Sequence, residues 1–150
     1  MNNDESPKSL IDGFKLSHQM LTDCISQVQL VTRSYPLAKQ KLKELYSNLL
    51  NHFTRQDHRL YDRLSLFYID DRQATKMLEF LTHDLKDLKI RYLVFFDLHP
   101  GEMTGGHPRT FPLDFNEFAK SILARIKMEE DYLFPLLEKL PGKSVIPAES

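Results

Sequence analysis

The sequence predicts an all-α protein, folded as an antiparallel up-down-up-down four-helix bundle. Apolar residues recur every three or four positions through four long segments, which is the period of one helix face. The alternation of apolar and polar residues that is typical of half-buried strands is absent. All but one of the links between the segments are short, and long helices joined by short links pack as antiparallel neighbours.

A proline-containing break separates the first two predicted helices. Ser6-Pro7 is a typical helix start, with a capping serine followed by proline in the first turn. We therefore expect the first helix to run from residue 7 to about residue 33. Ser34-Tyr35-Pro36 then interrupts the pattern, and the second helix is expected over about 37–67.

The third predicted helix begins after Asp70-Asp71 and continues to about Leu98. The only long loop of the chain follows it, over residues 99–113, and it contains two histidines. Loops of this length are often functional, but two histidines alone are weak evidence for a metal.

The fourth helix is predicted from a cap at Asp114 to about Leu140, where Pro141-Gly142 stops it. Pro135 lies inside this helix and predicts a kink or an early end. The bundle thus occupies residues 7–140 as a single domain, with tails at 1–6 and 141–150.

Composition and charge point to a cytoplasmic protein. The formal net charge of −1 favours neither a nucleic acid nor a membrane surface as a partner. The single cysteine, Cys24, excludes an internal disulfide and fits a reducing compartment. The polar N-terminal residues are unlike a secretory signal, and no apolar run approaches the length of a membrane span.

Five polar residues stand on helix faces that should carry only carbon. They are His18 in the first helix, His52 and Gln56 in the second, and Arg125 and Glu129 in the fourth. Burying such groups is costly unless they bond to one another or to a metal. Three helices are therefore predicted to direct polar groups into one interior. Imidazole together with carboxylate suits iron, manganese or zinc, so this interior is a candidate metal site.

Two segments resemble hemerythrin-like (HHE cation-binding) proteins. The matching residues are Arg125-Ile126-Lys127-Met128-Glu129-Glu130-Asp131-Tyr132-Leu133-Phe134-Pro135-Leu136-Leu137 for the last helix, and Leu49-Leu50-Asn51-His52-Phe53 with Asp57 and Leu60-Tyr61 for the second. His18 matches the first-helix histidine, and His83 is the best candidate in the third helix. The resemblance spans about residues 10–140. It implies a four-helix bundle around a non-heme di-iron centre that binds or senses oxygen or stores iron.

Two positions depart from the family pattern, which has a histidine four residues before a glutamate on the second and fourth helices. Here the pairs are His52 with Gln56 and Arg125 with Glu129. Gln56 still offers a carbonyl oxygen, but Arg125 stays protonated and cannot ligate a cation. A guanidinium about 4 Å from a divalent ion repels it by roughly 8 kcal/mol at an effective dielectric near 20.

Three interpretations of the interior follow. In the first, no metal is bound, and Arg125 donates to Glu129, Gln56 and a carboxylate of the third helix, Asp84 or Asp87. In the second, one metal, for which iron is the candidate, is held by His18, His52, His83 and Glu129. The third is a full di-iron site.

A weaker resemblance connects the chain with Rsd/AlgQ-type sigma-factor-binding regulators, which are all-helical. It rests on residues 53–64 and on Arg125-Ile126 with Glu129-Glu130 and Leu133. An arginine is normal at the position of Arg125 in those proteins, whereas His52 is not expected there. This resemblance implies a metal-free regulator of transcription that binds a sigma subunit.

The function predicted from the sequence is therefore a hemerythrin-like bundle with a degraded di-iron site. We expect a regulatory or sensory protein that acts through an unidentified protein partner and binds at most a single iron. A functional oxygen-binding hemerythrin-like protein and the sigma-factor regulator are the alternatives. Motifs of nucleophilic, phosphate-binding or di-iron carboxylate enzymes are missing from the sequence, so no catalytic activity is predicted.

Overall fold

The computed structural model describes residues 6–101 and 106–141. Residues 1–5, 102–105 and 142–150, which include most of both predicted tails and part of the predicted loop, lie outside the described residues. Within the described ranges every regular element is helical, which confirms the all-α prediction. None of these helices is both long and apolar enough to cross a membrane.

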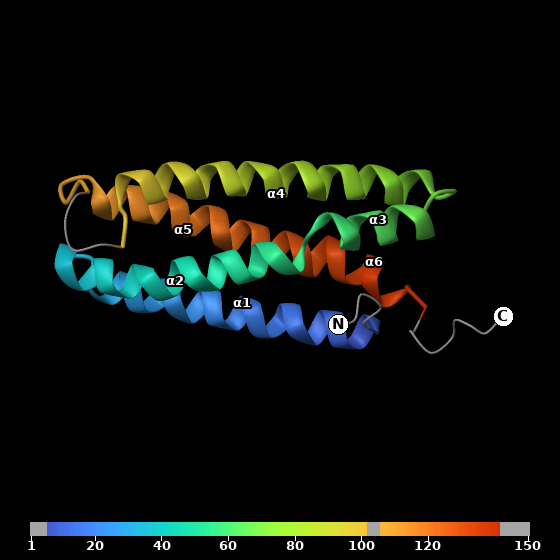
Figure 1. The fold of residues 1–150 in the computed structure, drawn as a ribbon, viewed down its shortest axis with the longest axis horizontal. Helices are drawn as coiled ribbons and strands as arrows, with labels where there is room; N and C mark the ends of the chain where they lie inside the picture. The colour runs from blue at the N-terminus through green and yellow to red at the C-terminus, as the bar shows by residue number, and fades with distance from the viewer. Residues whose placement is uncertain (1–5, 102–105, 142–150) are drawn as a thin grey trace.

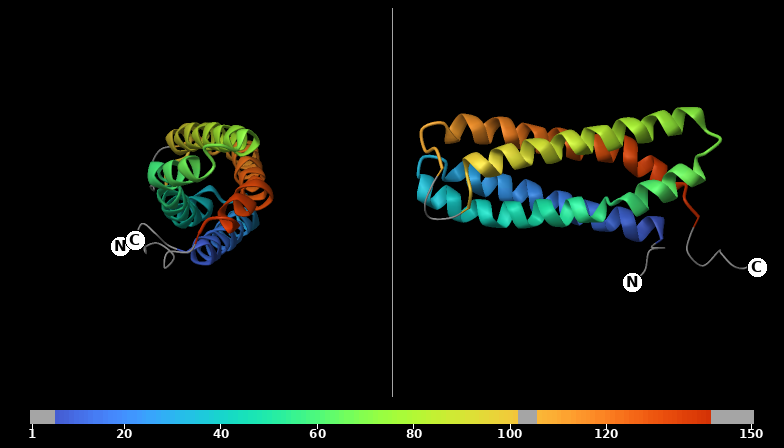
Figure 2. Two further views of the ribbon diagram at one scale, coloured as in Figure 1. Left: turned by 90° about the vertical axis from the view of Figure 1, so that its right-hand side faces the viewer. Right: turned by 45° about the horizontal axis from the view of Figure 1, so that its top comes forward.

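Four rods lie side by side to form the bundle, as Figures 1 and 2 show. The helices are α1 (Pro7–Leu30), α2 (Tyr35–Arg55), α3 (His58–Phe67), α4 (Arg72–Leu98), α5 (Phe111–Met128), the π-helix η1 (Glu129–Leu133) and α6 (Phe134–Glu138). The helices α2 and α3 together make the second rod, and α5, η1 and α6 make the fourth. Successive rods run in opposite directions, as the short links predict.

The second predicted helix is not continuous, and the expectation of one helix over 37–67 was wrong. The helix α2 ends at Arg55, and α3 begins at His58. Asp57 stops one helix and starts the next, because its side chain accepts a hydrogen bond from the Leu60 N–H at 3.2 Å. Gln56 lies at this break and is buried in the core, with 2% of its surface exposed.

The third helix begins as predicted, with the Asp71 side chain capping the Ala74 N–H at 3.0 Å. The fourth begins at Phe111, three residues before the predicted cap. Asp114 is not the cap; instead its carboxylate accepts a hydrogen bond from His99 Nε2 at 2.8 Å. The buried His99 also contacts the Tyr35 hydroxyl at 3.0 Å, so the α4–α5 connection is fastened to the start of α2.

Pro135 does not end the last rod but is preceded by a π-helical turn. Proline lacks an N–H and cannot continue the regular ladder of an α-helix. The Phe134 N–H instead bonds the carbonyl of Glu129, five residues back, and the chain remains helical to Glu138. Such π-turns often accompany functional sites, and this one holds Glu129 and Glu130.

Apolar side chains from all the helices fill the interior. The core cluster includes Phe14, Leu21, Ile25 and Val28 from α1, Leu42, Leu45 and Leu49 from α2, Leu81 and Leu85 from α4, Ile122 from α5 and Leu133 from η1. Near His99 the core becomes aromatic, and Phe95 stacks on Phe118 with ring centroids 4.5 Å apart. The polar residues described next lie toward the other end of the bundle, next to the α2–α3 break.

Candidate metal centre

His18 projects from α1 between two carboxylates. Its Nε2 is 2.6 Å from Oε1 of Glu129, and its Nδ1 is 2.9 Å from Oε2 of Glu130. Because ionised carboxylates only accept hydrogen bonds, both ring nitrogens must donate, and the ring is an imidazolium. Burial alone would lower the pKa of His18, but the hydrogen bonds and charges of the two glutamates raise it above its usual 6.5. The ring also stacks on Phe134, with centroids 5.6 Å apart.

His52 projects from α2 toward the same carboxylate. Its Nε2 lies 2.9 Å and 3.1 Å from the two oxygens of Glu129. Its other nitrogen, Nδ1, is 2.7 Å from the hydroxyl of Ser17 on α1. The serine therefore fixes the orientation of this ring, as Glu130 fixes that of His18.

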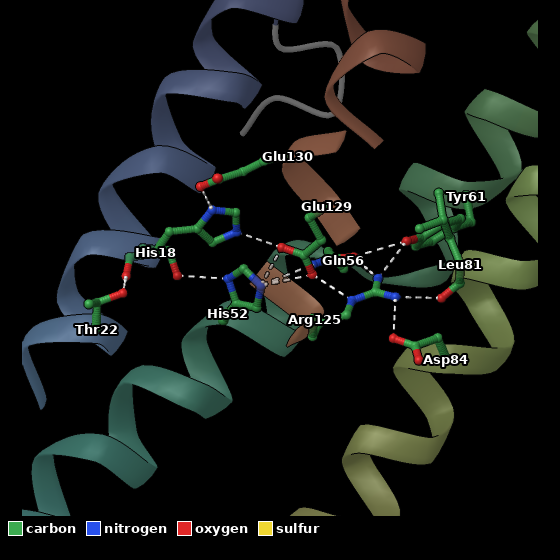
Figure 3. A network of polar contacts seen from close by, with 11 residues as sticks. His18, Thr22, His52, Gln56, Tyr61, Leu81, Asp84, Arg125, Glu129 and Glu130 are labelled. Atoms are coloured by element: carbon green, nitrogen blue, oxygen red, sulfur yellow. Dashed lines mark hydrogen bonds and ion pairs between the residues drawn. The ribbon is translucent and has the colours of Figure 1, made fainter. Parts of the chain in front are cut away.

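Glu129 is fully buried. Figure 3 shows it at the centre of the cluster, between the two histidines and Arg125. Besides the two histidines, its Oε2 accepts from Arg125 Nε at 2.7 Å and from Gln56 Nε2 at 2.5 Å. Burial alone would raise the pKa of Glu129. The hydrogen bonds from the histidines and the charge of Arg125 outweigh burial and hold this pKa far below its usual value.

Arg125 is 2% exposed, and all of its donors are engaged. Its Nε bonds Glu129; its Nη1 contacts the carbonyl of Leu81 at 2.8 Å and Oδ2 of Asp84 at 3.2 Å. Its Nη2 contacts Oε1 of Gln56 at 2.8 Å and the hydroxyl of Tyr61 at 3.1 Å. A guanidinium has five N–H groups, so no donor is left over for a further acceptor.

Tyr61 from α3 completes this side of the network. Its hydroxyl donates to Oε1 of Gln56 at 2.9 Å while it accepts from Arg125. Burial raises the pKa of Tyr61 to about 12, so the hydroxyl keeps its proton at neutral pH. The glutamine amide thus donates to Glu129 and accepts from Arg125 and Tyr61, and its Nε2 also lies 3.1 Å from His52 Nε2.

Two residues expected in the interior lie outside it. His83 was predicted as a fourth metal ligand and Asp87 as an acceptor for Arg125, but their side chains are 76% and 53% exposed. They face each other on the outer side of α4, with Nε2 and Oδ2 3.9 Å apart. The apolar face of α4 is buried through Leu81, Leu85 and Leu88, and this sets the rotation that turns His83 outward. Asp84, the alternative acceptor, does contact Arg125.

The sequence did not reveal three members of the site. Ser17 and Glu130 each adjoin a core residue, and such neighbours on a helix usually point away from the core. Tyr61 appeared in the sequence only as part of the second-helix residues that resemble hemerythrin-like proteins, with no predicted role in the site. The α2–α3 break places Tyr61 in the buried network, and the π-turn holds Glu130, which stays half-exposed, 2.9 Å from His18 Nδ1. Neither feature follows from the spacing of apolar residues.

The ligand atoms of His18, His52 and Glu129 all lie within 4.8 Å of one another, and the three residues are buried, so together they could hold one cation. Two histidines and one carboxylate with open positions are typical of non-heme ferrous sites. A second cation does not fit, because the guanidinium of Arg125 lies on the other side of Glu129 and Gln56 replaces a carboxylate. The fold and the cluster together define a four-helix bundle with a possible metal site in its interior.

The family model of the hemerythrin HHE cation binding domain matches residues 9–137. The chain therefore belongs to the hemerythrin family, which confirms the first resemblance found in the sequence. Searches among curated proteins and among solved structures gave no significant match.

Proposed function

We propose that this chain is a one-cation hemerythrin-like protein of the cytoplasm, in which metal occupancy acts as a regulatory signal to a protein partner. His18, His52 and Glu129 would hold the ion, and iron is the first candidate because the donor set is two imidazoles and a carboxylate. The observation that carries the proposal is the placement of Arg125, a permanent cation on the second side of Glu129.

The groups around the two histidines support this assignment. Metal-bound histidines commonly use their second nitrogen to contact a carboxylate or another oxygen, which fixes the ring. His18 has Glu130 at its Nδ1, and His52 has Ser17 at its Nδ1, so both Nε2 atoms point at the shared space beside Glu129. A bound iron would supply open coordination positions for a small ligand and a reversible one-electron change.

The histidines must change their protons when a cation binds. His52 can move its proton from Nε2 to Nδ1 and donate to Ser17, whereas His18 already donates at both nitrogens and must release one proton. Affinity should therefore fall by roughly tenfold for each pH unit below the raised pKa of His18.

Calorimetric titration of metal-free protein with anaerobic ferrous iron tests this proposal. We expect one ion per chain and, below the pKa of His18, about one proton released, measured by comparing buffers of different ionisation enthalpy. His52→Ala should abolish binding, and His83→Ala, at an exposed histidine, should leave it unchanged. Two ions per chain would contradict the role of Arg125. No binding would favour the metal-free regulator, since the network is already satisfied by its own hydrogen bonds.

The regulatory part of the proposal rests on where the ligands come from. His18, His52 and Glu129 belong to α1, α2 and η1, so one ion would tie three separate segments together. When iron is added, amide hydrogen exchange should slow in α1 near residue 18, in α2 near residue 52 and in η1. Exchange in α4, which contributes no ligand, should stay constant. Stoichiometric binding with unchanged exchange in all three segments would contradict a signal carried by the helices.

A further inference from the structure

A stripe of four residues on the outward side of α4 has no partner in the described part of the chain. Lys86, Ile90, Leu93 and Asp97 follow one another at intervals of four, three and four residues, so they lie along one face of the helix. Ile90 is 53% exposed and Leu93 is 62% exposed. We call these four residues the α4 seam. In Figure 1 the helix that bears it forms one long edge of the bundle.

We propose that the α4 seam binds a second copy of this chain, with the two α4 helices packed antiparallel about a two-fold axis. The charges of the seam select this occupant. If the axis passes midway between Ile90 and Leu93, each Ile90 faces Leu93 of the second copy, and each Lys86 faces Asp97 of the second copy. Two apolar contacts and two ion pairs then form at once, as an isologous interface requires.

Parallel packing of the same two helices would not pair the charges of the α4 seam. A parallel pair would place Lys86 against Lys86 and Asp97 against Asp97, and like charges across a helix interface disfavour pairing. Neither side chain has a hydrogen bond or ion pair within the described residues of its own chain. Both are therefore available to a second copy.

The surface beside the seam is shaped to receive side chains from a facing helix. Between α4 and α5 there is a groove of about 230 Å³, whose apolar wall includes Ile90, Val94 and Leu98. On the other side, between α2 and α4, a groove of about 730 Å³ is lined by Leu50, Phe53 and Leu93. The helix α4 is thus a ridge between two grooves, the geometry in which packed helices interlock.

Sedimentation of the full chain over a concentration series from about 5 to 500 µM tests the α4 seam, because single-helix contacts are small and bind weakly. We expect the mass to rise from 17.6 kDa toward twice that value. The double variant Ile90→Glu with Leu93→Glu should stay monomeric. Leu30→Glu, at an apolar residue of α1 that is 85% exposed, should dimerise as the parent does.

A charge swap tests the register. Lys86→Asp and Asp97→Lys should each weaken dimerisation by about tenfold, and the two together should restore it, because the pairs are then reversed. All four sites are exposed, and circular dichroism will verify that the variants fold. A monomer at every concentration overturns the proposal. A dimer that withstands Ile90→Glu with Leu93→Glu, or that the charge swap fails to restore, overturns it as well. None of these readouts depends on metal.

Discussion

Replacing Glu129 with glutamine should lower the free energy of unfolding of the metal-free protein by about 3–5 kcal/mol, because it strands buried positive charge. Arg125 and the imidazolium of His18 would keep only Asp84 and Glu130 as counter-charges, and both of these are partly exposed. The new amide would also present N–H groups to donors that now surround the carboxylate. Urea unfolding at neutral pH measures the change.

Glu117→Gln is the matched control, because Glu117 is an exposed glutamate on α5. It should change stability by no more than about 0.5 kcal/mol. If Glu129→Gln costs no more than this control, the carboxylate does not hold the network together.

Lowering the pH should reduce the difference in unfolding free energy between the parent and Glu129→Gln. The pKa of Glu129 is lowered on folding, so its stabilisation is complete above the ordinary 4.5 and is lost as pH falls toward the lowered value. The contribution of His18 to stability depends on pH in the opposite direction. Because its pKa is raised on folding, His18 stabilises the fold fully below pH 6.5, and this stabilisation is lost as pH rises through the raised pKa.

Arg125→Met should have opposite effects on stability and on metal affinity. Without metal, the buried Glu129 loses its guanidinium partner, and the fold should lose about 3–5 kcal/mol. Affinity for a divalent ion should rise by at least about tenfold. Even in a water-like dielectric at about 6 Å, a unit charge repels such an ion by roughly 1.4 kcal/mol.

The double variant Arg125→Met with Glu129→Leu measures how strongly the two charged side chains depend on each other. It removes both charges together, so its cost should be well below the sum of the two single changes. Arg91→Met, at an exposed arginine of α4, serves as the control for the loss of an arginine. If the losses of unfolding free energy in the two single variants simply add up to that of the double variant, Arg125 and Glu129 act independently. In the separate metal titration, an unchanged affinity in Arg125→Met would remove the argument against a second ion.

The helical periodicity of the sequence was enough to predict the bundle and the inward direction of His18, His52, Gln56, Arg125 and Glu129. Each of these residues stands at an apolar position of a long amphipathic pattern, which leaves its rotation about the helix axis little freedom. The same reasoning failed for His83. Its spacing of four from Asp87 suits a metal site and an exposed surface pair equally well, and the packing of Leu81, Leu85 and Leu88 decides between them.

Local departures from regular helix were the part that could not be predicted. The break at Gln56-Asp57 depends on a side-chain cap, and the π-turn depends on how the chain accommodates Pro135. A prediction from apolar periodicity assumes a uniform helix, so it cannot reveal either the break or the π-turn. Both irregularities bring side chains to the site, which is why Tyr61 and Glu130 were missed.

The engagement of all five donors of Arg125 separates the folding of the bundle from the supply of metal. Small metal-dependent domains are often unfolded until their ion arrives, so the ion determines how much folded protein exists. Here a permanent positive charge, encoded in the chain itself, already neutralises the buried glutamate. If the protein binds iron as proposed, a cell short of iron would still contain the complete fold, and a rise in iron would change its state rather than its abundance.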